Sequence, residues 1–406
     1  MLEPKITKVD NPGPLKLKAS VQQILSFFLL VGIVTFLLAL KFDPQRAWYS
    51  LLFNHFFFLC LGLAGIFFTA LQHATRSMWS VTVRRVAEAL TSYLPVAIAF
   101  VVLIIIVGSG KLYHWINPEV LAGHGAESST HATHNIFTPY LNLPFFSARQ
   151  LGFLAVWILF GTLLVRNSLK QDTGGDAGLS RKNIYLSIAF IPIFAFTFTF
   201  ACFDLLMSLE PGWYSTIFGV YCFAGLFQLG LSVIIILVIL LKQKGPLAGV
   251  VNTYHLKDLA NLLFAFSVFM AYIGFSQFML IWYANLPEET IFFLKRFQNG
   301  WVWVAVLLTF LKFFIPFFGL MALKAKANEK WLIIVASIVI LGEWLDIYWI
   351  VAPMFKATLV IPNWVEIGIF LGFAGLFGMA VSRFFQRNSV LAYNDPRILE
   401  SVNWEA

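Results

Sequence analysis

Three charged side chains lie inside two stretches of the chain that are otherwise apolar. Lys312 falls in Trp301–Leu323, and Glu343 and Asp346 fall in Trp331–Pro353. Each stretch is close to the ~20 residues that a helix needs to cross a bilayer. A charge at the centre of a membrane helix costs ~2.5–3.5 kcal/mol on insertion scales. We therefore expect these side chains to face protein, water or one another rather than lipid.

The short basic linker between the two stretches predicts how the charges pair. If two antiparallel helices fold about this linker, residues 324–330, Lys312 lies opposite Glu343. By the same arithmetic Thr309 lies opposite Asp346, and the two acids, three residues apart, share one helix face. The sequence thus predicts a two-rung polar ladder. Such a ladder is either a structural ion pair that fastens two helices or a relay station for protons, and both readings stay open.

Pro316 interrupts the first of these helices four residues after Lys312. Proline has no backbone N–H, so the Lys312 carbonyl loses its helical hydrogen-bond partner. Membrane helices tolerate such a loss where a neighbouring group or water satisfies the carbonyl. We expect one of these partners beside Lys312.

The composition excludes a soluble globular chain. Of 406 residues, 59% are hydrophobic and only 12% are charged, whereas about 25% charged residues is usual in soluble domains. The net charge of +8 does not indicate nucleic acid, because the charges lie in short loops between apolar spans. Cys60, Cys202 and Cys222 are far apart in the sequence and match no haem-attachment or iron–sulfur spacing.

The apolar spans predict an all-α polytopic membrane protein with ten transmembrane helices. The third span is the shortest, and we expect its helix to begin a turn early, near Ala89. The expected spans are Val21–Leu40, Leu51–Ala74, Leu94–Val107, Ala148–Val165, Ile184–Met207, Tyr214–Leu241, Leu259–Tyr283, Trp301–Leu323, Trp331–Pro353 and Trp364–Phe385.

The basic residues predict the orientation. With ten helices, 20 of the 28 Lys and Arg residues fall on the side of the two termini, seven on the other side and one within the membrane. This bias predicts that both termini lie in the cytoplasm. The expected parts are a cytoplasmic tail (1–20), a first membrane half (21–210), a second membrane half (211–386) and a second cytoplasmic tail (387–406).

Other polar residues lie near the expected ends of spans. His55 and Asp204, with Glu210 in the following turn, could accept the two protons of a quinol on the external side. The alternative is an interfacial histidine and a helix-end turn residue. His55 and His73 lie on one helix, 18 residues or ~27 Å apart. A bis-histidine haem needs facing helices, so we expect no haem on this chain.

A second polar group lies near the cytoplasmic end of the second span. It consists of His73, Arg76, Arg84, Arg85 and Glu88. We interpret it mainly as an excess of basic residues that marks the cytoplasmic side of the membrane. The candidate residues of a proton pathway are therefore Lys312, Glu343, Asp346, Thr309, Asp204 and His73.

The long external loop, residues 109–147, holds His114, His124, His131 and His134. An H-x-x-H pair could bind a metal, but no carboxylate or thiol accompanies it at ligand spacing. We expect a solvated or partner-facing loop and no metal site.

Three runs of residues resemble a known family. They are residues 203–216 (FDLLMSLEPGWYST), 254–259 (YHLKDL) and 275–289 (FSQFMLIWYANLPEE). The first resembles a turn in the NrfD-like family of polysulfide-reductase membrane subunits. Most of the chain is similar to the second NrfD-like subunit of bacterial alternative complex III, a quinol:cytochrome c oxidoreductase.

This resemblance implies a fold, a location and partners. The fold is two four-helix bundles, spans 2–5 and 6–9, flanked by spans 1 and 10, in the bacterial inner membrane. The redox centres, haem c and iron–sulfur clusters, reside in partner subunits: a multihaem cytochrome c, an iron–sulfur protein and a mono-haem cytochrome c. The other partners are a sister NrfD-like subunit, a terminal oxidase and membrane lipids. The quinone site is better placed in the sister subunit, which leaves proton movement and scaffolding for this chain.

Two other functions compete with a subunit of a quinol-oxidising complex. A secondary transporter would show paired broken helices around a site at the membrane midplane, and only one charged, proline-interrupted helix is evident here. A purely structural membrane subunit is the third candidate.

Overall fold

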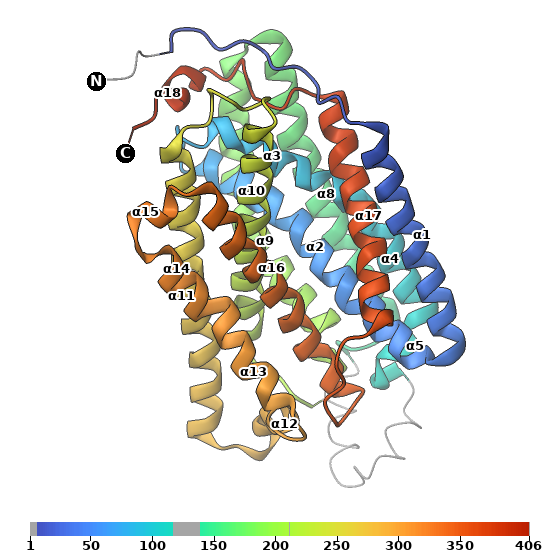
Figure 1. The fold of residues 1–406 in the computed structure, drawn as a ribbon. Coiled ribbons are helices and arrows are strands. Elements are labelled where there is room, and N and C mark those ends of the chain that lie inside the picture. The colour runs from blue at the N-terminus through green and yellow to red at the C-terminus, as the bar shows by residue number, and fades with distance from the viewer. Residues whose placement is uncertain (1–5, 117–138, 211, 406) are drawn as a thin grey trace.

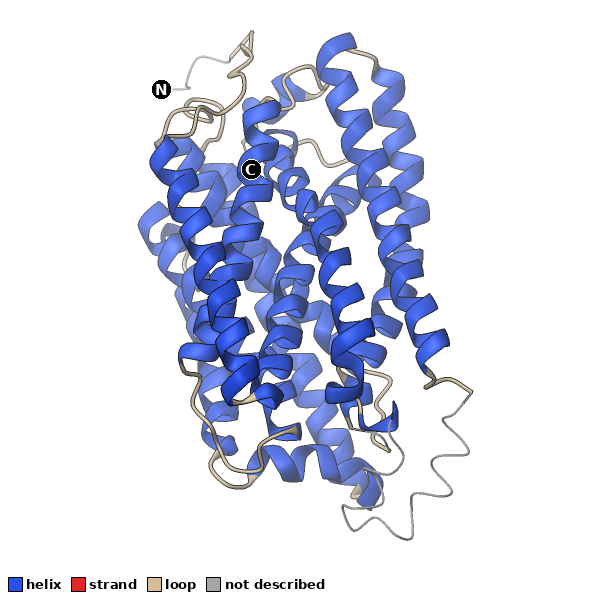
Figure 2. Cartoon of the chain, turned by 90° about the vertical axis from the view of Figure 1, so that its right-hand side faces the viewer, coloured by secondary structure: helices blue, strands red, loops and turns tan. Residues whose placement is uncertain are grey.

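The computed structural model describes residues 6–116, 139–210 and 212–405. Within them, ten helical spans are long and apolar enough to cross a membrane. This confirms the all-α polytopic fold. The spans run side by side along the length of the molecule, and both chain termini lie at the same end (Figure 1). Loops and short helices join the spans at the two ends (Figure 2).

The first half of the chain supplies five of the spans. Span 3 consists of several consecutive helical segments, of which α3 and α4 are the longest. The helices are α1 (Ala19–Phe42), α2 (Pro44–Ala74), α3 (Val81–Leu90), α4 (Leu94–Leu103), α8 (Leu143–Gly174) and α9 (Ala177–Leu205).

The second half supplies the other five spans and an additional short helix, α12, at the end opposite the termini. Span 8 is divided into α13 and α14 by a π-helical segment. The helices are α10 (Phe218–Gln243), α11 (Thr253–Ala284), α12 (Pro287–Phe297), α13 (Trp301–Thr309), α14 (Ile315–Met321), α16 (Glu329–Val351), α17 (Trp364–Arg387) and, near the C-terminus, α18 (Ile398–Val402).

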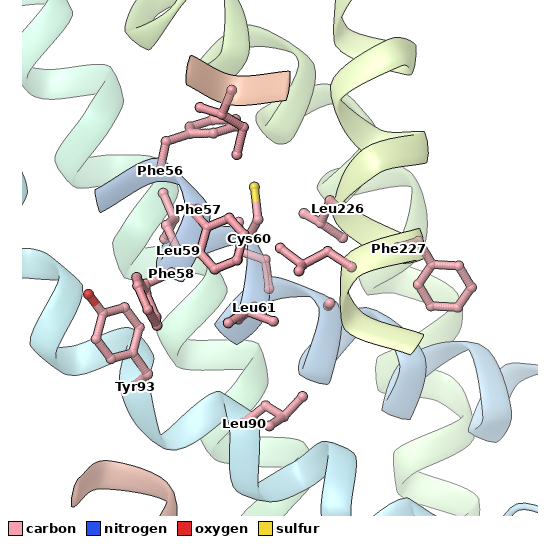
Figure 3. Packing of buried hydrophobic residues seen from close by; sticks show 14 of the residues in the cluster. Phe56, Phe57, Phe58, Leu59, Cys60, Leu61, Leu90, Tyr93, Leu226 and Phe227 are labelled. Atoms are coloured by element: carbon pink, nitrogen blue, oxygen red, sulfur yellow. The ribbon is translucent and has the colours of Figure 1, made fainter. Parts of the chain in front are cut away.

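Helix α2 lies at the centre of the molecule and is almost wholly buried. It packs against α3, α8 and α9 of its own half and against α10, α16 and α17 of the other half. The Phe67 ring lies 4.9 Å from the Phe223 ring and 5.0 Å from the Phe227 ring, centroid to centroid. Cys60 lies nearby, among apolar side chains of α2 and α10 (Figure 3). The two halves therefore share one hydrophobic core.

Helices α1 and α17 pair with each other along one side of the molecule (Figure 1). Glycines allow the close approach, since a Cβ atom on Gly32 would lie 2.3 Å from the Gly372 Cα atom. Small residues at such contacts let membrane helices pack backbone to backbone. The other spans are not divided into two separate groups, because α2 and α9 of the first half both pack against α10 of the second half.

The expected start of span 3 was wrong. The helix begins at Val81 rather than near Ala89, so that Arg84, Arg85 and Glu88 lie inside it and are fully buried. A hydropathy reading places charged residues in loops, and it cannot detect acids elsewhere in the chain that pair with them. The extra length brings this polar segment into the protein interior.

Candidate functional site

Lys312 lies close to two carboxylates near the middle of the membrane-spanning region. Its Nζ atom is 2.7 Å from Asp346 Oδ2 and 3.1 Å from Glu343 Oε2. All three side chains are buried. We call Lys312, Glu343 and Asp346 the core triad. The predicted pairing of Lys312 with Glu343 is confirmed, and Lys312 also pairs with Asp346.

The predicted rung between Thr309 and Asp346 is wrong. The Thr309 side chain is exposed, and its hydroxyl donates to the Ala305 carbonyl, 3.0 Å away in the same helix. The π-helical segment Phe310–Phe314 follows directly. A π turn contains an additional residue, so the side chains of this segment are not spaced around the helix as in a regular α-helix.

The carbonyl freed by Pro316 has the kind of partner that the sequence predicts. Gln228 Nε2 of α10 donates to the Lys312 carbonyl oxygen at 2.8 Å and lies 2.8 Å from Ser267 Oγ of α11. A neighbouring side chain thus satisfies the broken helix. The amide also ties α10, α11 and span 8 together beside the core triad.

Helix α10 contributes two further residues that sequence reasoning missed. The Tyr221 hydroxyl donates to Asp346 Oδ1 at 2.6 Å. Gly225 leaves room for Glu343, because a Cβ atom at Gly225 would lie 2.7 Å from Glu343 Oε2. Tyr221, Gly225 and Gln228 are spaced four and three residues apart, which places them on one helix face. This stripe of polar and small residues on an otherwise apolar helix was the sequence pattern that could have indicated a contact between α10 and the core triad.

The core triad has one basic and two acidic groups, so its formal charges balance when it holds one proton. Isolated net charge in a low-dielectric interior is costly. Glu343 Oε1 has no hydrogen-bond partner among the described residues. It borders a cavity of about 10 Å³ that Asp346 also lines, which is about the room that one water molecule needs. The triad therefore has the composition of a site that can take up and release a proton.

A larger cavity of about 460 Å³ opens on the other side of Asp346. Lys312, Asp346 and Thr309 line its inner end, and Phe292 of α12 lines it at the end of the molecule opposite the termini. Gln277 is buried in the wall of this cavity. The cavity connects the core triad with one side of the molecule.

His55 and Asp204, the candidate quinol residues on the external side, each have their own surroundings. Asp204 accepts hydrogen bonds from Arg149 at 2.8 Å and from Gln150 at 2.9 Å. His55 is fully buried near the rings of Phe100 and Phe373, and neither ring nitrogen has a partner among the described residues. A salt bridge to Arg149, 55 residues earlier, explains the burial of Asp204 without a quinol.

Glu210 and His73 also lie away from the core triad. Glu210 Oε1 is 2.7 Å from Lys295 Nζ of α12, so that it fastens the loop after α9 to that helix. His73 is buried, with Nε2 3.4 Å from Asn183 Nδ2. The charges around His73 are those of Arg84, Asp395 and Arg397. His73 therefore belongs with a second group of buried charges near the termini.

This second group, the tail cluster, consists of Arg84, Arg85, Arg397, Glu88, Asp172 and Asp395. Arg84 Nη2 is 2.7 Å from Asp395 Oδ2, and Arg84 Nε is 3.4 Å from Glu88 Oε1. Arg85 lies 2.7 Å from Glu88 and 2.5 Å from Asp172. The cluster joins α3 to α8 and to the C-terminal segment. Sequence reasoning missed two of these partners. Asp172 is 87 residues after Arg85 in the chain, and Asp395 is 311 residues after Arg84.

Asp395 is held in its ionised form within the tail cluster. Burial raises the pKa of Asp395, but the charge and hydrogen bond of Arg84, with a backbone hydrogen bond at Arg397, outweigh burial and hold this pKa below its usual 3.8. The carboxylate is therefore ionised at neutral pH. Its salt bridge keeps the C-terminal segment attached to the membrane domain.

No metal centre is formed by three or more His, Cys, Asp or Glu side chains in the described ranges. The loop histidines His124, His131 and His134 lie outside those ranges. Comparison of the sequence with models of known families and with curated proteins found no match.

Proposed function

We propose that this chain is a membrane subunit of a respiratory quinol:electron-acceptor oxidoreductase of the alternative complex III type, and that its core triad is a proton-exchange station. The end with both termini faces the cytoplasm of a bacterial cell, and the cavity beside Asp346 faces outward. Haem c, iron–sulfur clusters and the site of quinol oxidation belong to partner subunits. Quinol at His55, Asp204 and Glu210 has less support, since Asp204 and Glu210 are engaged in salt bridges.

One observation carries the proton part of this proposal: a buried triad with one acid in excess borders a cavity. A balanced ion pair has no group that must exchange a proton, whereas two carboxylates sharing one lysine hold one proton between them. Asp346 lies where the triad meets the cavity. In the proposed step, a proton passes between Asp346 and Glu343 while Lys312 stays between them. The proton then leaves through the cavity.

The respiratory part rests on the residues 203–216, 254–259 and 275–289, which resemble membrane subunits of alternative complex III. It is tested by purifying the chain through an affinity tag from its native membrane. We expect haem-containing subunits to comigrate with it on a native gel. Migration of the chain alone, from mild detergent that preserves other respiratory complexes, would contradict this assignment.

The proton part needs its own test. The purified complex is reconstituted in vesicles, and protons released per electron are measured for the unmodified chain and for Asp346→Asn. A proton station predicts unchanged quinol oxidation and a lower ratio. An unchanged ratio would reduce the core triad to a structural element.

A secondary transporter remains the alternative from another functional class. One observation favours it, because span 3 also contains a π-helical segment, Ile104–Gly108, so that two spans are interrupted. However, Ile104–Gly108 has the sequence IIIVG and contains no ionisable side chain. The charged site at Lys312 therefore has no counterpart there, which favours the proton-station reading.

A further inference from the structure

A crevice of about 550 Å³ lies between α4, α8 and α17, near the end of the molecule that carries the termini. Its walls are largely apolar, and its outer rim is basic and hydroxyl-rich. It is separate from the core triad and from the larger cavity beside Asp346, with which it shares no lining residue. Its lining includes Ile158, Thr162, Arg166, Lys170, Thr173 and Phe384.

The rim consists of one exposed stripe of α8. Arg166, Lys170 and Thr173 are spaced four and three residues apart and so lie on one helix face. Neither Arg166 nor Lys170 makes a salt bridge or hydrogen bond to any described residue through its charged group. The opposite face of α8 holds Ser168 and Asp172, which bind the buried Glu88 and Arg85. The charged groups of Arg166 and Lys170 therefore remain unpaired, within the described part of the chain, on the exposed face of α8.

We infer that this crevice binds an anionic phospholipid. Its phosphate lies between Arg166 and Lys170, and one acyl chain follows the apolar wall toward Ile158. Ile158 and Arg166 are eight residues apart on one helix, so this wall extends ~12 Å into the hydrocarbon region. Basic pockets between membrane helices on the cytoplasmic side are suited to anionic headgroups. A soluble anion would use the rim but would leave the apolar wall uncovered.

The bound lipid has a structural consequence. Helix α8 contacts α4 along one side, and Phe384 of α17 lies across the crevice. An acyl chain in the crevice covers apolar side chains of all three helices at once. The lipid thus extends the contact between the first membrane half and the flanking pair α1 and α17.

The test is native mass spectrometry of the purified full chain titrated with phosphatidylglycerol, phosphatidylcholine or inorganic phosphate. We expect phosphatidylglycerol to bind about tenfold more tightly than phosphatidylcholine. Both lipids carry a phosphate, but the choline ammonium of phosphatidylcholine cancels its charge, whereas the headgroup of phosphatidylglycerol keeps a net negative charge beside the two cations. The double variant Arg166→Gln with Lys170→Gln should lower phosphatidylglycerol binding to the level of phosphatidylcholine. The matched control, Arg181→Gln with Lys182→Gln, removes two exposed charges at the start of α9 and should leave binding unchanged.

A second variant examines the apolar wall without changing any charge. Thr162→Trp fills the crevice from its exposed side and should weaken the binding of both lipids. Equal binding of the two lipids by the unmodified chain would overturn the inference. So would equal losses in the two double variants, or full displacement of phosphatidylglycerol by inorganic phosphate at the same concentration.

Discussion

The core triad and the tail cluster are both buried groups of opposite charges, yet they differ in balance and access. The tail cluster has Arg84, Arg85 and, 3.7 Å from Asp395, Arg397 against three acids. The core triad has Lys312 alone against two acids and borders two cavities. A balanced cluster can remain permanently ionised and fasten helices. A cluster with an unmatched acid must hold a proton, and a cavity gives this proton a way out.

The strongest test of the fastener role is Arg85→Met in the tail cluster. The change leaves Asp172 without an arginine and leaves Glu88 with only its longer contact to Arg84. Breaking a buried pair in this way costs ~3–5 kcal/mol. We expect a much lower thermal unfolding temperature in detergent. The protons released per electron by any complex that still assembles should be normal. Arg181→Met, an exposed arginine, is the control and should unfold normally; normal unfolding of Arg85→Met too would mean that the tail cluster fastens nothing.

Lys312→Met should be nearly as destabilising, since it leaves two buried carboxylates without a cation. A variant that restores stability must remove both acidic charges, because Lys312 pairs with both Glu343 and Asp346. We expect Lys312→Met with Glu343→Gln and Asp346→Asn to regain most of the stability but not the proton release. If the triple variant also pumped normally in reconstituted vesicles, the proton route would lie elsewhere.

Asp346→Asn alone separates the two roles most sharply. It leaves Lys312 paired with Glu343, so the triad stays neutral and the free energy of unfolding should change by only about 1 kcal/mol. The triad no longer has a second acid, so protons released per electron should fall. Asp395→Asn is the matched change in the tail cluster, and we expect it to alter stability but not the ratio. If Asp395→Asn lowered the protons released per electron and Asp346→Asn did not, the tail cluster would be the proton site and the core triad the fastener.

The tail cluster should also respond to acid. Asp395 has a pKa below its usual 3.8 in the folded protein, so its ionised form adds stability at higher pH. That stability is lost as the pH falls below about 3.8 through the folded-state pKa. We expect protease to cut the C-terminal segment faster in this range, whereas in Asp395→Asn the cutting should be fast already at neutral pH. Equal acid dependence in both proteins would point to another group.

The smallest effect is expected at Gly225, beside Glu343. In Gly225→Ala the new Cβ atom would lie 2.7 Å from Glu343 Oε2, so the carboxylate must move from its present position beside Lys312. We expect a destabilisation of ~1 kcal/mol and a small drop in protons per electron. The control is Gly152→Ala on α8, where a Cβ atom has nothing within 4 Å. If both variants behave alike, the room around Glu343 does not matter.

Several features followed from the sequence because their causes are local in the chain. The ten spans follow from runs of apolar residues long enough to cross a bilayer. Lys312 and Glu343 could be paired because a short linker fixes two adjacent antiparallel helices. Pro316 predicted a satisfied Lys312 carbonyl because the loss of an N–H is a property of proline itself.

Other features depended on how distant helices pack, and no local pattern contains that information. Tyr221 reaches Asp346 across 125 residues, and Arg84 reaches Asp395 across 311 residues. The position of Thr309 depended on a π turn, which rotates the helix between two nearby residues. Sequence alone thus determined that charges are buried in this membrane protein. Only the tertiary structure decided which charges meet, whether they balance and which of them reach a cavity, because all three depend on contacts between helices.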